Sequence, residues 1–138
     1  MIKIIMGQKG AGKTKTLIDI VNKATGEEKG NVVCVTNGNR LLFDLKSSVR
    51  LADTSDFDLN FYMLFYGYLC GIISRDYDIT HIFIDSITKI VNPDLNEFNV
   101  FLEHLEKLAE KFNISFTITV SADASEANGL MKKYLMEF

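Results

Sequence analysis

Hydrophobic and polar positions along the chain form two kinds of pattern. Short stretches that are apolar at nearly every position are typical of strands buried on both faces of a parallel sheet. Stretches with apolar residues three or four positions apart are typical of helices that bury one face. Strands are therefore predicted at 2–6, 31–36, 80–84 and 114–120, and helices at 13–24, 61–74, 98–112 and 127–136.

The predicted strands and helices alternate, which indicates an α/β fold. We expect a three-layer parallel sheet of about four to five strands with helices on both faces, in one domain that covers residues 1–138. Residues 41–58 show no sustained period, and we expect irregular structure or short elements there. Pro93 suits the beginning of the helix that follows it, because the first helical residue needs no N–H.

The segment 61–74 is apolar nearly all round. This pattern is typical of a helix in the core or at a subunit contact, and burial within the chain is the preferred interpretation. The longest apolar stretch, 59–73, is shorter than the roughly 20 residues that span a bilayer. Residues 2–6 lead into a glycine loop without a cleavage region, which predicts a strand in a cytoplasmic protein with no membrane insertion.

Charge and composition narrow the functional classes. The formal net charge of −3 at pH 7 offers no broad electropositive surface, so nucleic-acid binding is not supported. Cys34 and Cys70 form no metal-binding pair, and we expect both to be small buried hydrophobic residues in a reducing compartment. His81 and His104 lack the spacing of metal ligands, and we interpret both as structural or surface residues.

A phosphate-binding motif follows the first predicted strand. Residues 7–14, GQKGAGKT, fit the pattern G-x-x-x-x-G-K-S/T and stand between a strand and a helix, as the motif requires. Its glycines let backbone N–H groups face one anionic pocket, to which the helix N-terminus adds its dipole. Lys13 is expected to reach the β and γ phosphates. The predicted nucleotide-binding residues are Gly7, Gln8, Lys9, Gly10, Ala11, Gly12, Lys13 and Thr14.

Asp85 follows the third predicted strand, where P-loop proteins hold magnesium. Asp85 and the Thr14 hydroxyl are therefore the predicted Mg²⁺ ligands. Because the carboxyl ends of parallel strands share one edge of a sheet, the glycine loop, Asn37, Asp85 and Ser121 should converge there. Lys13 and Asp85 are the first catalytic candidates, followed by Asn37 and Ser121.

With both motifs present, the chain resembles the P-loop NTPases. The segments FIDSITKIV and FLEHLEKLAEKFNISFTITVSA are similar to the Walker B strand, the next helix and the sensor strand of the RecA-like ATPases. This resemblance implies a strand inserted between those bearing Gly7 and Asp85. It also implies that Ser121 lies near the γ-phosphate as a sensor.

The sequence departs from this family in one respect. RecA-like ATPases carry a glutamate after the second strand or beside the Walker B aspartate, whereas here the second strand leads into TNGNR and Ser86 follows Asp85. Asn37 or Asn39 could orient water but could not act as a general base. The substitutes left open are Asp44, Asp53 or a residue of a partner, and the candidate arginine fingers are Arg40, Arg50 and Arg75.

These features predict an Mg²⁺-dependent ATP-binding protein whose ATP hydrolysis is slow or activated by a partner. The predicted partners are the nucleotide and either another protein or further copies of the chain in a homo-oligomer. GTP is disfavoured because no N-K-x-D guanine motif is present. The first alternative is a regulatory module that binds nucleotide without hydrolysing it. The second is a small-molecule kinase, whose acceptor pocket only residues 41–58 could supply.

Overall fold

The computed structural model describes residues 1–92 and 94–137, and its centre is a six-stranded sheet in which all paired strands run parallel. The order of the strands is β3-β2-β4-β5-β1-β6. Pro93, predicted at the beginning of a helix, lies outside the described residues. The strands are β1 (Ile2–Gly7), β2 (Asn31–Thr36), β3 (Arg50–Asp53), β4 (Ile79–Ile84), β5 (Ser115–Ser121) and β6 (Leu135–Met136).

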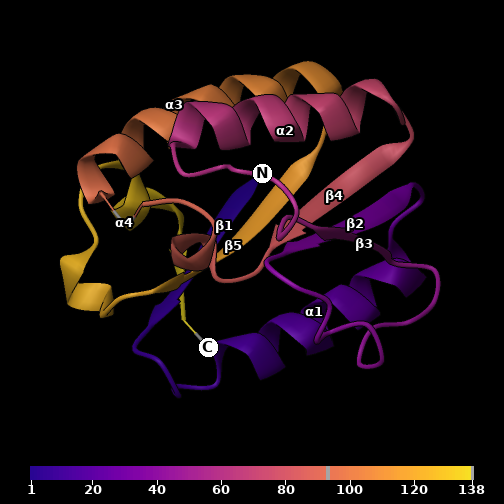
Figure 1. Ribbon diagram of the computed structural model, residues 1–138, viewed down its shortest axis with the longest axis horizontal. Coiled ribbons are helices and arrows are strands. Elements are labelled where there is room, and N and C mark those ends of the chain that lie inside the picture. The colour runs from indigo at the N-terminus through magenta and orange to yellow at the C-terminus, as the bar shows by residue number, and fades with distance from the viewer. Residues whose placement is uncertain (93, 138) are drawn as a thin grey trace.

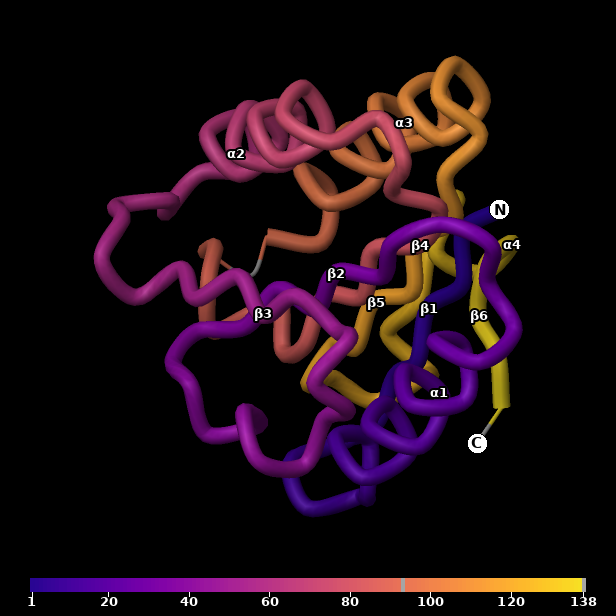
Figure 2. Tube along the Cα trace, turned by 90° about the vertical axis from the view of Figure 1, so that its right-hand side faces the viewer, coloured from indigo at the N-terminus to yellow at the C-terminus, as the bar shows by residue number. Residues whose placement is uncertain are grey.

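Helices cover both faces of this sheet, as predicted (Figure 1). One face carries α1 (Lys13–Glu27), and the other carries α2 (Tyr62–Ser74), α3 (Leu95–Phe112) and the short α4 (Leu130–Tyr134). Two single-turn 3-10 helices, Ile87–Lys89 and Ala124–Glu126, follow β4 and β5. Figure 2 shows the strands as one layer between α1 and the pair of α2 and α3. The three-layer α/β prediction is confirmed.

The two helical layers bury two apolar clusters. On the α1 side, Leu17 and Val21 pack with Cys34 and Phe83, and all four are fully buried. On the other side, aromatic residues of α2 and α3 pack on the sheet, and burial of each such side chain stabilises the fold by about 1.5–3 kcal/mol. Burial also raises the pKa of the Cys34 thiol to about 12, and Cys34 is the small buried hydrophobic residue that was predicted.

The sheet has two strands that the sequence pattern did not predict. β3 lies within residues 41–58, where irregular structure was expected, and it pairs with β2. β6 lies within 127–136, which was predicted as one helix, so the helix is shortened to α4. Leu135 and Met136 are extended because they pair with Ile4 and Ile5 of β1, whose edge would otherwise be open.

The order of the strands determines which loops meet. β5 lies between β1 and β4, as the RecA-like resemblance implied. Gly7 pairs with Ser121, and Ile84 pairs with both Val35 of β2 and Ile118 of β5, so the carboxyl ends of the four central strands share one edge. No helix of the described residues is long and apolar enough to cross a membrane.

Candidate functional site

The glycine loop connects β1 to α1 through backbone conformations that favour glycine. Gly10 and Gly12 have φ of 88° and 94°, in the left-handed region that costs other residues roughly 1–2 kcal/mol. The Ala11 N–H donates to the Gln8 carbonyl and closes the turn at 3.0 Å. Gly12 begins α1 without a side-chain cap, so first-turn N–H groups are available to an anion.

Lys13 is the first residue of α1, and its side chain contacts this loop. Its ammonium donates to the Gln8 carbonyl at 2.9 Å, and the residue is only 6% exposed. Burial lowers the pKa of Lys13, Asp85 opposes that effect, and the positive charge of Lys89 adds to it. The amine is therefore held against the loop backbone, and an anionic ligand beside it would raise its pKa.

Asp85 is buried beside the first turn of α1. The Thr14 hydroxyl lies 3.4 Å from its Oδ1, and the Thr119 hydroxyl donates to the same oxygen at 3.1 Å. The Ser86 N–H donates to the Thr119 oxygen at 2.6 Å, and Ser86 has a φ of 53°. Because a buried carboxylate is costly unless it is hydrogen-bonded, Thr119 both stabilises Asp85 and fixes its direction.

A cavity of about 420 Å³ opens beside these groups. Five of its lining residues are cationic and, among the described residues, no aspartate or glutamate lines it. A chain with a net charge of −3 therefore has a local cavity suited to a polyanion. The lining residues are Lys9, Gly10, Gly12, Lys13, Thr14, Lys15, Arg40, Ser86, Thr88, Lys89 and Ser121.

The structure brings most of the predicted site residues together. Lys13, Thr14 and Ser121 line the cavity, and Asp85 contacts Thr14. Asn37, which was predicted to converge on this site, does not line the cavity, and its side-chain amide donates to the Lys89 carbonyl at 3.4 Å. Gly7, Gln8 and Ala11 belong to the loop but do not line the cavity. The Gln8 side chain lies 3.5 Å from the Asp123 carboxylate.

The candidate substitutes for the missing glutamate lie elsewhere. Asp53 accepts hydrogen bonds from the Ser55 and Gly38 N–H groups, and these bonds lower the pKa of Asp53. The backbone carbonyl of Asp44 is held by Asn22 of α1. Asp53 and Asp44 do not line the cavity.

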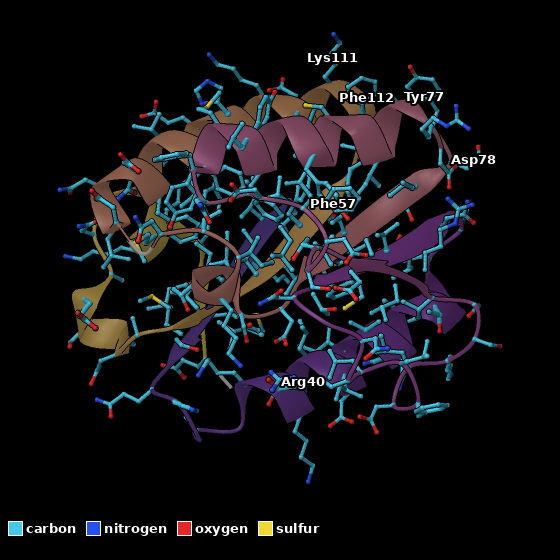
Figure 3. All side chains as sticks on the ribbon, viewed as in Figure 1. Arg40, Phe57, Tyr77, Asp78, Lys111 and Phe112 are labelled. Carbon is cyan, nitrogen blue, oxygen red and sulfur yellow. The ribbon has the colours of Figure 1, made fainter. Side chains whose placement is uncertain are left out.

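Only one of the three candidate arginines reaches the site. Arg40 lines the cavity, and its guanidinium lies 3.9 Å from the Asp85 carboxylate. It extends from the loop after β2 and lies beside α1 (Figure 3). Arg50 pairs with Asp76 at 3.0 Å, and Arg75 follows the last turn of α2.

Thr119 and Lys89 are site residues that sequence reasoning missed. The bond from Thr119 to Asp85 joins residues 34 positions apart, which no local motif predicts. The signal that could have found Thr119 is a threonine within the apolar stretch ISFTITV, two residues before Ser121. Lys89 belongs to the 3-10 turn after Asp85, a segment for which no element was predicted.

The histidines lie outside this cavity. His81 bonds to Glu28 at 3.0 Å and Thr117 at 2.9 Å, and His104 bonds to the Val100 carbonyl at 2.9 Å. Among the described residues, no group of three His, Cys, Asp or Glu could hold a metal ion. A cation at Asp85 would therefore depend on further oxygens from a ligand or water.

Comparison with known proteins supports the fold. No family model and no curated protein matches the sequence. Among solved structures, the chain is similar to the flagellar accessory protein FlaH from Methanocaldococcus jannaschii, with a TM-score of 0.54 and 14% identity over 96% of this chain. It spans 65% of the length of FlaH. The likeness concerns the fold alone and confirms the predicted α/β fold with a parallel sheet, and the position of β5 between β1 and β4 is compatible with a RecA-like fold.

Proposed function

We propose that this chain is an Mg²⁺-dependent ATP-binding domain whose site is the cavity between the glycine loop and Asp85. The observation that carries the proposal is the approach of the Thr14 hydroxyl to the buried Asp85 carboxylate at 3.4 Å, directly beside Lys13. A hydroxyl and a carboxylate are the protein ligands that Mg²⁺ takes in phosphate sites. The donor set therefore fits a magnesium–nucleotide complex.

Each residue has a separate task in this proposal. The backbone around Gly10 and Gly12 binds phosphate oxygens, while Lys13 exchanges the Gln8 carbonyl for the β and γ phosphates. Thr14 and Asp85 hold Mg²⁺, which would neutralise phosphate charge when bound. Ser121 lies at the cavity wall on β5 and would bind the terminal phosphate through its hydroxyl.

The proposed turnover is slow or dependent on a partner. General-base catalysis needs a group that can accept a proton, and no aspartate or glutamate of the described residues lines the cavity. The same observation favours the first alternative, a regulatory module that binds nucleotide without turnover. A kinase has less support, because part of segment 41–58 packs through Leu41 and Val49 into the core beside α1.

The test is a titration of the full chain with ATP and with GTP, each with and without Mg²⁺, followed by phosphate release from the same sample. We expect saturable binding that prefers Mg·ATP. Lys13→Ala should weaken binding roughly 10- to 100-fold, the value of one charge-assisted hydrogen bond. The control is Lys23→Ala, a cation on the exposed side of the same helix. No binding of either nucleotide by folded wild type would contradict the proposal.

Phosphate release separates the two leading functions. Turnover that disappears in Lys13→Ala, or that rises when a partner is added, identifies an ATPase. Saturable binding with no release above that of Lys13→Ala identifies the regulatory module.

A further inference from the structure

The outer face of α2 is apolar and exposed, and no residue of α2 lines the phosphate cavity. Phe61, Met63 and Leu64 are 60%, 52% and 50% exposed. Between Leu59 and Ser74 the sequence has no charged residue. Monomeric proteins rarely expose contiguous apolar patches of this kind, so the face is suited to a protein contact.

Two glycines, Gly67 and Gly71, lie near the centre of this face. Gly67 and Gly71 follow Met63 at four-residue intervals, so the three lie along one side of the helix. Both glycines are exposed, and a Cβ added at either would meet no atom within 4 Å. A second helix can therefore approach the α2 backbone closely here, one and two turns after the exposed Met63.

The neighbouring ridge of α3 carries opposite charges at its two ends. Glu97 borders the apolar cleft at the beginning of α2, whereas Lys107 and Lys111 border the cleft at its end. The ion pairs among the described residues involve none of these three side chains. Figure 3 shows Lys111 beside Phe112 and Tyr77 at the carboxyl end of the two helices.

The residues that would make the contact are spaced symmetrically along α2 and α3, on either side of the level of Gly67 and His104. The His104 ring packs edge-on against Tyr66, beside Gly67. Glu97 and Lys111 stand seven residues before and after His104, or ~10 Å in either direction. Met63 and Gly71 stand four residues before and after Gly67.

We propose that a second copy of this chain packs on the face, with its α2 antiparallel to the first and a two-fold axis near Gly67. A two-fold contact must be complementary to itself, and this register meets that condition. Met63 of each copy fills the space over Gly71 of the other, and Glu97 of each copy faces Lys107 and Lys111. The phosphate cavities stay open because no residue of α2 or α3 lines them.

The test measures the dimer dissociation constant of the full chain by analytical ultracentrifugation. Gly71→Leu should raise it at least tenfold without lowering the melting temperature measured at low concentration, where both proteins are monomers, because leucine suits an exposed helix position better than glycine does. Loss of the dimer therefore cannot be attributed to unfolding. A wild-type chain that stays monomeric up to roughly 1 mM, or a Gly71→Leu dimer of unchanged affinity, would overturn the proposal.

Charge reversal tests the antiparallel register. Glu97→Lys should weaken the dimer, because it places like charges opposite Lys107 and Lys111. Adding Lys107→Glu and Lys111→Glu should restore it. The matched control is Glu103→Lys, the same change at an exposed position of α3 that borders neither cleft. A triple variant no tighter than Glu97→Lys would contradict this register, whatever the nucleotide titration shows.

Discussion

α1 and α2 cover opposite faces of the same sheet but differ on their outer sides. Each buries one apolar stripe, which includes Leu17 and Val21 in α1 and Phe65 and Leu69 in α2. The outer positions of α1 include lysines and Asp19, whereas the exposed positions of α2 before Ser74 are apolar or glycine. Because the core specifies only the inner stripe, the outer stripe is free to serve function. In our two proposals, the N-terminus of α1 binds phosphate while its outer side stays solvated, and the outer side of α2 contacts another chain.

The largest expected effect tests the difference between the inner and outer stripes. Leu17→Ala should cost about 2–5 kcal/mol of unfolding free energy, because it leaves a cavity at a fully buried position. Leu64→Ala, at the half-exposed position on α2, should change it by only about 0.5 kcal/mol. Urea unfolding at low protein concentration measures both. Similar losses in the two variants would show that the outer side of α2 is part of the core.

The glycines of the two helices should respond in opposite directions. Gly12→Ala places a methyl group at a φ of 94°, so it should destabilise the chain by about 1–2 kcal/mol and weaken ATP binding. Gly67→Ala should stabilise the monomer by up to about 1 kcal/mol, because the site is helical and open. Thermal unfolding at low concentration, with and without ATP, measures both. A stabilising Gly12→Ala would contradict the assigned loop conformation.

The two faces of the sheet also differ along β5. Its apolar residues face α2 and α3, and the threonines that alternate with them lie on the α1 side. Thr119→Val removes a hydrogen bond to Asp85, worth about 1 kcal/mol, so Mg·ATP affinity should fall roughly fivefold while that for ATP alone changes little. Thr117→Val is the control, since that hydroxyl bonds to His81. Calorimetric titration compares the two. Equal losses in both variants would refute the positioning role of Thr119.

The smallest expected effect concerns His81, which joins β4 to the end of α1 through Glu28. Burial lowers the pKa of His81 below its ordinary value of 6.5 more than Glu28 raises it. The unfolded chain therefore binds the extra proton first, and stability present above pH 6.5 is lost as the pH falls through the folded-state pKa. Unfolding free energies measured across this range should decline less in His81→Gln. An equal decline would exclude His81 as the cause.

The sequence predicted the elements whose patterns are long or apolar. The interior strands and α1, α2 and α3 repeat their burial pattern over enough residues to be recognised. The edge strands were missed because β3 has four residues and β6 has two, and only pairing with a neighbour makes them strands.

The candidate site, like the fold, was predicted only where the sequence has a local signature. The glycine loop and Asp85 were predicted because each has a local signature of its own. The contacts of Arg40 and Thr119 with Asp85 were not predicted, since both depend on the order of strands in the sheet. Cys70 was expected to be buried, but it is partly exposed on α2 because the outer side of that helix is uncovered.

The central claim is that Thr14 and Asp85 form a magnesium site for a bound nucleotide. The most direct test is ATP binding to wild type and to Asp85→Asn, each with and without Mg²⁺. We predict that Mg²⁺ tightens binding to wild type and gives little or no tightening in Asp85→Asn, while metal-free affinities stay similar. Equal tightening by Mg²⁺ in both proteins, or no ATP binding by folded wild type, would contradict the claim.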